Sequence, residues 1–495
     1  MSRAPLVLGL DSSTQSTKAI AWTPEGEAVA EGRAPHAIDA PRPGWAEQDP
    51  EAWWRAARTA IGAALREVNP ARLQGLAISN QRETCALLAA DGTPARPALL
   101  WLDERGRSEL PWLAEAIGAE RLHAITGKPL DLTPVISRLA WVARHEPETL
   151  ARTALILDVQ GYLVGRLTGR ATTSWTSADP FGLFDIAAKD WSEPILAALG
   201  IARDRLAPLG RPGAPAGRVS AEAAAATGLP EGLPVTLAGG DGQCAGLGAN
   251  ATRAGTAYLN LGTALILGVW SEAPRIGRHW RTMTSPTGEG YFLEAVQRAG
   301  SYLLNWLIDT FAGGRSDPGV FARLDREAAA IPLGSEGLAL SPYLTGCMDP
   351  HWDPDARAAL VGLAPFHGPA HLYRAALEAL TVESARALDA MRREGLAPRR
   401  IVAVGGGAAN PLWTRLFADA TGLPVARSRA IEASALGAGM AAAVGAGWFP
   451  SFDAAARAMA REEEPVRPDP SQAAAWTALS ARQGRVYRRE PPAPA

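Results

Sequence analysis

Residues 6–22 read LVLGLDSSTQSTKAIAW: an apolar run, a cluster of small hydroxyl side chains and a second apolar run. The pattern predicts two short strands, 6–10 and 18–23, joined by a polar turn. The hydroxyl and backbone N–H groups of such a turn can cradle phosphate oxygens, and Lys18 can add a positive charge. Asp11 would repel a phosphate unless a divalent cation lies between them, and Mg²⁺ binds nucleotide phosphates together with one or two carboxylates. The alternative is a solvent-exposed Ser/Thr turn that begins at a strand-terminal Asp.

Length and charge exclude several classes of protein. The chain has 495 residues, enough for two or more domains, each with a full core. Its formal net charge of -2 argues against a nucleic-acid binder, which normally carries a strong basic excess. We find no run of about 18 apolar residues and no signal-peptide layout at the N-terminus. We therefore expect neither a nucleic-acid partner nor a membrane association.

The cysteines and lysines are few. Cys85, Cys244 and Cys347 lie far apart and form no CxxC pair. Three such cysteines indicate neither a disulfide framework nor a zinc site, so we expect free thiols and a cytoplasmic protein. Only three of the 49 basic residues are lysines, so Lys18 in the polar turn is less readily explained by background composition.

Strands and helices alternate along most of the first half, which predicts an α/β fold. After the first hairpin, Asp49 and Pro50 mark the start of a helix whose apolar residues recur at helical spacing. GLAIS (75–79), CALLAA (85–90) and ALLWLD (98–103) are typical of further strands.

The second half begins as the first does. AYLNLGTALILGVW (257–270) is again a strand, a small polar turn and a strand that ends in Trp. It is either a second copy of the first hairpin or an unrelated one. RRIVAVGGGAANPLWTRLFADATG (399–422) predicts a strand, a glycine turn and an amphipathic helix, and EASALGAGMAAAVGAG (432–447) predicts a helix of very small residues. The charged, Pro-rich stretch from about Arg461 predicts a peripheral tail.

Two common nucleotide-binding motifs are absent from the sequence. None of the lysines fits GxxxxGK[ST], and the glycine run Gly405-Gly406-Gly407 does not fit GxGxxG, which weakens a dinucleotide-binding interpretation. The glycine run can still let a nucleotide approach the backbone closely. The alternative is a tight strand–helix turn.

A polar segment, NQRET (80–84), follows the strand at 75–79. Ligands of open α/β sheets bind beyond the carboxyl ends of strands. Arg82 donates hydrogen bonds and Glu83 accepts them, a combination suited to the neighbouring hydroxyls of a sugar or polyol. The alternative is an exposed charged turn.

The segment ALLWLDERG (98–106) offers further side chains for binding a sugar. On a strand, Trp101 and Asp103 share one face because they are two residues apart. An indole beside a carboxylate suits the C–H face and the hydroxyls of a sugar. The alternative places Trp101 in the core and Asp103 at the end of the strand.

Asp241 lies between glycines in PVTLAGGDGQCAGLG (234–248), where a strand is expected to end. The flanking glycines would leave its carboxylate accessible, and an Asp at such a place can accept the proton of a hydroxyl during phosphoryl transfer. It can also be the N-cap of a helix that begins near Gln243. The two roles do not exclude each other.

The order of these segments resembles the FGGY family of carbohydrate kinases. The matching segments are, in chain order, GLDSSTQSTKA, SNQRET, WLDER, ITGKPLD, AGGDGQCAGLG, LNLGTA, PHWDPDARAALVGL, GGGAANPLWTRLFADATGLPV and ALGAGMAAAVGAG. The resemblance implies an α/β architecture of two actin-like, ribonuclease H-like domains with ATP in the cleft between them. We expect the domains to span residues 1–247 and 248–495.

The resemblance also implies roles for individual residues. Asp241 matches the catalytic base, and Asp11 and Asp241 are the carboxylates expected to associate with Mg²⁺. The residues expected to bind ATP are Asp11, Thr14 and Lys18 in a first phosphate loop, Gly262 and Thr263 in a second, and Gly405, Gly406 and Asn410 at the adenosine. The residues expected to bind the sugar or polyol are Gln81, Arg82, Glu83, Trp101, Asp103 and Asp241.

The predicted function is transfer of the γ-phosphoryl group of ATP to a small sugar or polyol, with ATP and Mg²⁺ as cofactors. QRET resembles glycerol kinases, but the aromatic that those enzymes have near Thr133 is missing. We therefore favour a ketopentose such as xylulose or ribulose, with glycerol or another polyol as the alternative. An alternative of another class is an actin-like ATPase that acts as a chaperone or reactivating factor. A homodimer is a candidate assembly.

Overall fold

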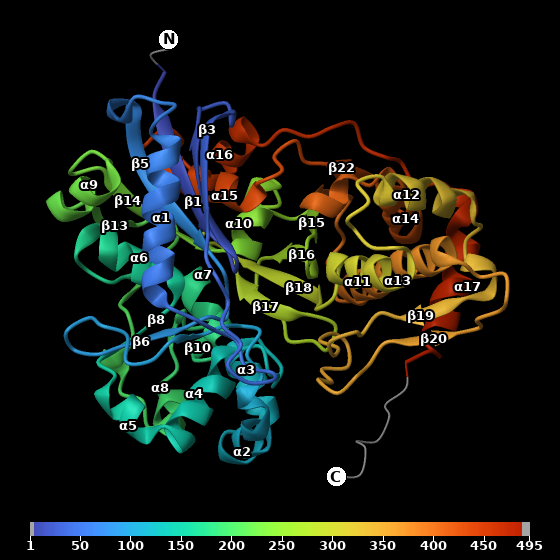
Figure 1. Ribbon diagram of the computed structural model, residues 1–495, viewed down its shortest axis with the longest axis horizontal. Helices are drawn as coiled ribbons and strands as arrows, with labels where there is room; N and C mark the ends of the chain where they lie inside the picture. Colours follow the sequence, from blue (N-terminus) through green and yellow to red (C-terminus); the bar gives the residue numbers. More distant parts are fainter. Residues whose placement is uncertain (1–3, 488–495) are drawn as a thin grey trace.

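The computed structural model describes residues 4–487, and it contains two six-stranded sheets (Figure 1). The strands of the first sheet are, in spatial order, β13 (Pro215–Arg218), β14 (Pro234–Gly240), β5 (Leu73–Asn80), β1 (Leu6–Ser12), β2 (Ser16–Trp22) and β3 (Ala28–Pro35). The strands of the second sheet are β17 (Arg281–Thr284), β18 (Tyr291–Gln297), β16 (Leu265–Ser271), β15 (Thr256–Leu261), β21 (Arg400–Val404) and β22 (Val425–Arg427).

Five strands of each sheet share one topology, and the sixth strands, β13 and β17, lie at opposite edges. In the first sheet, β1 pairs antiparallel with β2 and parallel with β5, which in turn pairs parallel with β14. In the second sheet, β15 pairs antiparallel with β16 and parallel with β21, which in turn pairs parallel with β22. The two hairpins predicted from the sequence therefore occupy the same position in their sheets, as a second copy would.

Residues 6–10 of β1 are apolar because both faces of the strand are buried. Leu6, Leu8 and Leu10 face one set of helices, and Val7 faces another. The helices on the first face are α1 (Pro50–Ala64), α6 (Val159–Thr168) and α9 (Ala221–Thr227). Those on the second face are α10 (Asp241–Gly248), α15 (Ala433–Gly445) and α16 (Phe452–Met459). As predicted, Asp49 is the N-cap of α1 and accepts a hydrogen bond from the Glu51 N–H group.

Helix α15 is the predicted helix of small residues. It packs directly on α10 and the first sheet, and a Cβ atom added to Gly437 would lie 2.1 Å from the carbonyl oxygen of Cys244. Only glycine permits so close an approach. Since α15 comes from the predicted C-terminal domain, the two predicted domains share a helix, and the boundary at 247/248 stays a prediction.

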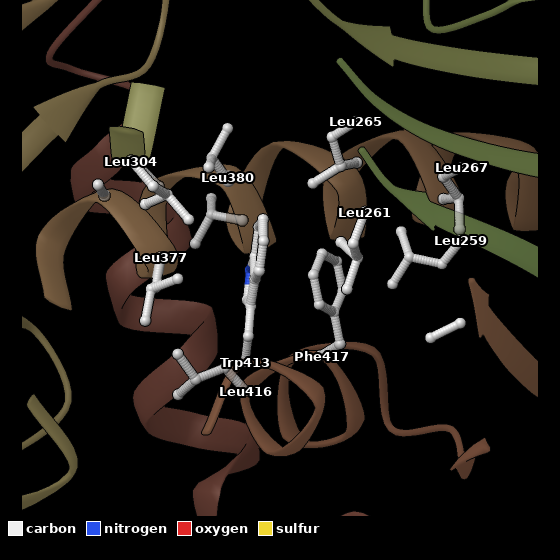
Figure 2. Packing of buried hydrophobic residues seen from close by; sticks show 14 of the residues in the cluster. Leu259, Leu261, Leu265, Leu267, Leu304, Leu377, Leu380, Trp413, Leu416 and Phe417 are labelled. Carbon is white, nitrogen blue, oxygen red and sulfur yellow. The ribbon is translucent and has the colours of Figure 1, made fainter. Parts of the chain in front are cut away.

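The second sheet is covered on one face by five helices. They are α11 (Ser301–Phe311), α12 (Val320–Ala330), α13 (Pro369–Arg393), α14 (Pro411–Thr421) and α17 (Ala473–Gln483). Figure 2 shows Trp413 and Phe417 of α14 among leucines of β15, β16, α11 and α13. On the other face, Tyr258 and Phe292 pack on α10, where a Cβ atom added to Gly246 would lie 2.6 Å from Phe292. Helix α10 therefore lies between the two sheets.

A helical subdomain extends the first half of the chain (Figure 1). Its helices are α2 (Leu110–Ala116), α3 (Ala119–Thr126), α4 (Val135–His145), α5 (Pro147–Arg152), α7 (Trp175–Ala178) and α8 (Glu193–Leu199). Short strands pair here as β4 (Glu47–Gln48) with β7 (Ala98–Leu99), β6 (Ala86–Leu88) with β8 (Leu155–Leu157), β9 (Thr173–Ser174) with β12 (Leu209–Gly210), and β10 (Phe184–Asp185) with β11 (Asp190–Trp191). One more pair, β19 (Ala339–Ser341) with β20 (Ala359–Val361), lies in the second half.

Three local predictions are wrong. The strand expected at 98–103 ends at Leu99, so Trp101 lies in a turn and does not share a strand face with Asp103. Helix α10 begins at Asp241 itself, and Gly240 is its N-cap. The expected tail from Arg461 contains α17, whose Trp476 and Leu479 are buried in the second core, so apolar contacts hold it in place. Residues 488–495 of this stretch lie outside the described residues.

Two expectations concern the whole chain. Cys85, Cys244 and Cys347 are buried free thiols. Between residues 4 and 487, none of the helices combines the length and the apolar character needed to cross a membrane.

Candidate active site

The candidate site of the first sheet lies where three parallel strands end. In the register of β1, β5 and β14, Asp11 lies beside Ser79, and Asn80 lies between Ser12 and Gly240. The residues that follow these strands therefore meet at one edge, as expected for ligand sites of open α/β sheets. This edge brings together the polar turn after Asp11, the segment 81–84 and Asp241.

Asp11 is buried, and its two carboxylate oxygens accept hydrogen bonds from Ser13 Oγ (2.7 Å) and Ser79 Oγ (2.9 Å). Burial raises the pKa of Asp11, against the opposing effects of these hydroxyls and of Lys18. Lys18 lies opposite Asp11 on β2, and its ammonium group forms an ion pair with Glu432, which also pairs with Arg33. The positive charge of Lys18, in the predicted phosphate loop, is therefore already paired with the carboxylate of Glu432, which precedes α15.

We expect Glu432→Gln to strengthen binding of ADP by about twofold to fivefold, because a partly buried ion pair contributes up to about 1 kcal/mol. The substitution frees Lys18 for a phosphate and removes a negative charge from its vicinity. Fluorescence titration with a labelled ADP measures the change. Glu463→Gln is the matched control, since Glu463 forms a surface ion pair with Arg427 elsewhere. Weaker binding in Glu432→Gln would show instead that Glu432 orients the lysine.

Thr14 is held from two sides. Its hydroxyl accepts a hydrogen bond from Trp101 Nε1 (2.9 Å), and its carbonyl accepts one from Gln48 Nε2 (2.7 Å). Trp101 therefore reaches the first loop from a turn, without the strand that the sequence predicted.

Arg82 and Glu83 form a buried ionic cluster with two residues of the second sheet. Arg82 pairs with Glu294 of β18 (2.7 Å), Glu83 pairs with Arg281 of β17 (2.6 Å), and Arg281 also pairs with Glu294 (3.1 Å). Tyr258 OH donates a further hydrogen bond to Glu294 (2.6 Å). The cluster joins the two sheets beside the candidate site. Sequence reasoning missed Arg281 and Glu294; the signal was a single acidic residue inside the apolar strand YFLEAVQ (291–297).

Gln81 and Asp103 are enclosed by protein. Gln81 is 1% exposed and donates a hydrogen bond from Nε2 to Gln48 Oε1 (3.1 Å). Asp103 is fully buried, pairs with Arg105 (2.7 Å) and accepts a hydrogen bond from the Ala46 N–H group (2.7 Å). In the structure these two side chains support the loops around the site, and neither presents an exposed surface to a ligand.

Asp241 is the accessible carboxylate of this edge. It is the first residue of α10, 38% of its side chain is exposed, and Arg82 Nε lies 3.3 Å from its Oδ1. Loss of solvent around its carboxyl group raises the pKa of Asp241 to about 6. The positive charge of Arg82 opposes this rise, and the negative charges of Asp11 and Glu83 add to it. The flanking glycines make room for Arg82, because a Cβ atom at Gly240 or Gly242 would lie within 2.6 Å of its side chain.

The donor set at this edge suits a hydrated Mg²⁺. The negative charge of Asp11 is one cause of the raised pKa of Asp241, after burial. A cation near both would relieve that repulsion. Within residues 4–487, no group of three or more His, Cys, Asp or Glu residues is placed to enclose a metal ion. A site with so few protein ligands fits Mg²⁺, which keeps several waters and phosphate oxygens as ligands.

The predicted nucleotide residues of the second sheet also lie at one edge. Gly262 and Thr263 follow β15, and Gly405 and Gly406 follow the parallel strand β21. Gly405 has a φ of 82°, and a Cβ atom there would lie 2.7 Å from Asn260 Oδ1, so the turn requires glycine. Asn410 caps α14, and its amide donates to Asp325 Oδ1 (2.7 Å). Among residues 4–487, no hydrogen bond or ion pair joins this edge to the loop from Asp11 to Lys18.

Gly300 and Ser301, two residues that sequence reasoning missed, hold the second loop in place. The Gly300 N–H group donates to the Thr263 carbonyl (2.8 Å), and the Ser301 N–H group donates to the Gly262 carbonyl (2.9 Å). A Cβ atom at Gly300 would lie 2.7 Å from the backbone of Leu265. The only local signal was the glycine between a strand and a helix.

Comparison with known proteins agrees with this arrangement. The model of the N-terminal domain of the FGGY family of carbohydrate kinases matches residues 6–248, and the model of its C-terminal domain matches residues 257–446. The chain is 30% identical over 460 residues to the xylulose kinase of Bacillus subtilis, covering 92% of this chain and 91% of that protein. It is 33% identical over 488 residues to the glycerol kinase of Aromatoleum aromaticum, covering 94% of this chain and 96% of that protein.

Solved structures show the same two-domain fold. The xylulose kinase of Rhodospirillum rubrum superposes with a TM-score of 0.89 at 30% identity, over 97% of this chain and 98% of that one. The glycerol kinase of Plasmodium falciparum, solved with ADP, superposes with a TM-score of 0.87 at 21% identity, over 98% of this chain and 99% of that one. The predicted fold class is confirmed, and the family match favours the kinase over the chaperone alternative. The chain belongs to the FGGY family of carbohydrate kinases, phosphotransferases that use ATP and Mg²⁺ and an alcohol group as acceptor.

Proposed function

We propose that this kinase phosphorylates a ketopentose, such as xylulose or ribulose. The observation that supports phosphoryl transfer to a hydroxyl is Asp241: an accessible carboxylate at the start of a helix that lies between the two sheets, with Arg82 3.3 Å away. The xylulose kinases among the relatives at about 30% identity support the choice of acceptor.

In this proposal Asp241 is the general base. Its ionised carboxylate accepts the proton of the acceptor hydroxyl while that oxygen forms a bond to the γ-phosphorus, and the bond from the γ-phosphorus to the leaving oxygen of ADP breaks. Arg82 keeps Asp241 ionised, since it opposes the rise in pKa that burial causes. Lys18, the N–H groups after Asp11 and the loop at Gly262 and Thr263 bind phosphate oxygens.

Asp11 and Asp241 are the proposed Mg²⁺-associated carboxylates. When bound, Mg²⁺ supplies positive charge that offsets the charge on the phosphate oxygens. We assign the adenosine to Gly405, Gly406 and Asn410. Trp101, Arg82 and Glu83 line the acceptor side, with Gln81 and Asp103 behind them.

A glycerol or polyol kinase is the second candidate, because the chain is 33% identical to a glycerol kinase and carries Arg82-Glu83 after β5. A coupled assay of ADP release over xylulose, ribulose, ribitol, erythritol, glycerol and hexoses separates the two. We expect a ketopentose to give the highest kcat/KM. A higher value for glycerol or another polyol would overturn the choice of acceptor, and no stimulation by any of them would overturn the sugar-kinase proposal.

We further propose a cytoplasmic location, because three buried free thiols suit a reducing compartment. A homodimer stays a prediction, which light scattering coupled to size-exclusion chromatography tests.

A further inference from the structure

Gln48 lies at the centre of a hydrogen-bonded group that sequence reasoning did not single out. It ends the short strand β4, pairs with Ala98 of β7, and its side chain is fully buried. It belongs to neither the first loop nor the segment 81–84, but its amide touches both.

All four hydrogen-bonding positions of this amide are used. Gln48 Nε2 donates to the Thr14 carbonyl (2.7 Å) and lies 3.1 Å from His36 Nδ1. Gln48 Oε1 accepts from Trp53 Nε1 (2.8 Å) and from Gln81 Nε2 (3.1 Å). An amide offers two donors and two acceptor lone pairs, so none is left over.

The partners also fix which way the amide points. A carbonyl can only accept a hydrogen bond and an indole N–H group can only donate one, so Thr14 identifies the nitrogen and Trp53 identifies the oxygen. His36 Nδ1 must then accept from Gln48, which requires a neutral imidazole. Burial lowers the pKa of His36 to about 4, so the ring is neutral at physiological pH. A flipped amide would oppose donor to donor and acceptor to acceptor.

The amide therefore joins two segments that we assign to different substrates. Thr14 belongs to the proposed phosphate loop, and Gln81 precedes Arg82 and Glu83 of the proposed acceptor site. The backbone repeats the link, because the Gln81 N–H group donates to the Ser12 carbonyl (2.8 Å). Thr84 Oγ1 in turn donates to Gln81 Oε1 (3.3 Å), so the far end of the segment is tied to the same side chain.

We infer that Gln48 is a positioning residue that couples the nucleotide loop to the acceptor segment, an inference that rests on the proposed function for what each segment binds. A shift of Thr14 against a phosphate moves the Gln48 amide, and the amide moves Gln81. Misplacement of either reacting group by about 1 Å can lower the rate by about 100-fold. The coupling thus ties alignment of the acceptor to the presence of the nucleotide.

Hydrogen exchange with ADP as the added ligand tests the inference without knowledge of the acceptor. In the full-length wild type, ADP should slow exchange in peptides that cover residues 12–17, which it contacts, and also in those that cover 80–85, which it does not. In Gln48→Met the change at 80–85 should become much smaller, because only the backbone link from Gln81 to Ser12 remains, while the change at 12–17 persists. ADP should also bind about fivefold more weakly, the size expected for the net loss of one hydrogen bond.

Trp53→Phe is the matched control, because it removes a hydrogen bond to the same amide and leaves the links to Thr14 and Gln81 in place. Its melting temperature should fall, but the change at 80–85 on addition of ADP should persist. Equal behaviour of Gln48→Met and Trp53→Phe would overturn the inference. Gln48→Glu is a second variant of nearly the same shape. If neither Gln48 variant folds, the wild type alone tests the inference: exchange at 80–85 that does not change on addition of ADP would overturn it. Failure of ADP to change any peptide would refute the proposed kinase function instead.

Discussion

Replacing Asp241 with Asn should lower kcat by about 10²- to 10⁴-fold, the usual contribution of a general base. Asn has nearly the same shape as Asp, but its amide cannot accept a proton from the acceptor hydroxyl. ADP binding should change little, because the proposed adenosine residues lie at the other sheet edge, after β15 and β21. Stopped assays of sugar phosphate formation measure the rate, and titration with labelled ADP measures the binding.

Asp389→Asn is the control for this substitution, since Asp389 is an exposed carboxylate that pairs with Arg392 on α13. Its kcat should equal that of the wild type. Turnover by Asp241→Asn at the rate of Asp389→Asn would contradict the role of Asp241 as the base.

The same role predicts the pH profile of the wild type. Because burial raises the pKa of Asp241 to about 6, the ionised form that accepts a proton is present above that pH and is lost below it. The kcat/KM value should therefore be flat above about pH 7 and fall about tenfold per unit of pH well below 6. Bound Mg²⁺ would shift this transition to lower pH. A profile that rises toward low pH would exclude an ionised base.

Replacing Glu294 with Gln should lower the free energy of unfolding by about 3–5 kcal/mol, the usual cost of leaving a buried charge without its partner. Glu294 is fully buried and pairs with both Arg82 and Arg281. An amide at this position leaves the two guanidinium groups with less negative charge and turns an N–H group toward donors. Urea unfolding at pH 7 measures the loss.

The control is Glu289→Gln in the same β-hairpin, where Glu289 is 79% exposed and pairs with Arg211. This change should stay within about 0.5 kcal/mol. Burial acts to raise the pKa of Glu294, but Arg82 and Arg281 outweigh it and hold the value at about 2. The cluster therefore contributes its stability above about pH 4.5 and loses it as the pH falls toward 2. Equal stability of the two variants would contradict this account.

The parts of the fold that the sequence predicted depend on neighbours along the chain. The strand–turn–strand of residues 6–22 and the start of α1 at Asp49-Pro50 are local patterns, and the structure contains both. The strand expected at 98–103 is cut short because Trp101 turns to reach Thr14, 87 residues earlier. The stretch after Arg461 reads as polar, but α17 is held by a few buried side chains such as Trp476.

The site residues also separate into those that local sequence predicts and those that it does not. Asp11, the segment 80–84 and Asp241 were predictable, because polar residues at strand ends collect at one sheet edge. The partners that set their chemistry were not. Glu294 is 212 residues from Arg82, and Glu432 is 414 residues from Lys18. No periodicity or spacing within one segment reveals contacts at such separations.

Helix α15 has a consequence for how the chain is made. During synthesis, the strands of the first sheet leave the ribosome long before residues 433–445, which cover one of its faces. At about 5–20 residues per second, that face is covered only in part, by α10, for roughly 10–40 s after β14 emerges. Nascent chains in this interval expose apolar strands to solvent and to chaperones, and a ribosome stalled before residue 433 would carry a half-finished lobe that is prone to aggregate.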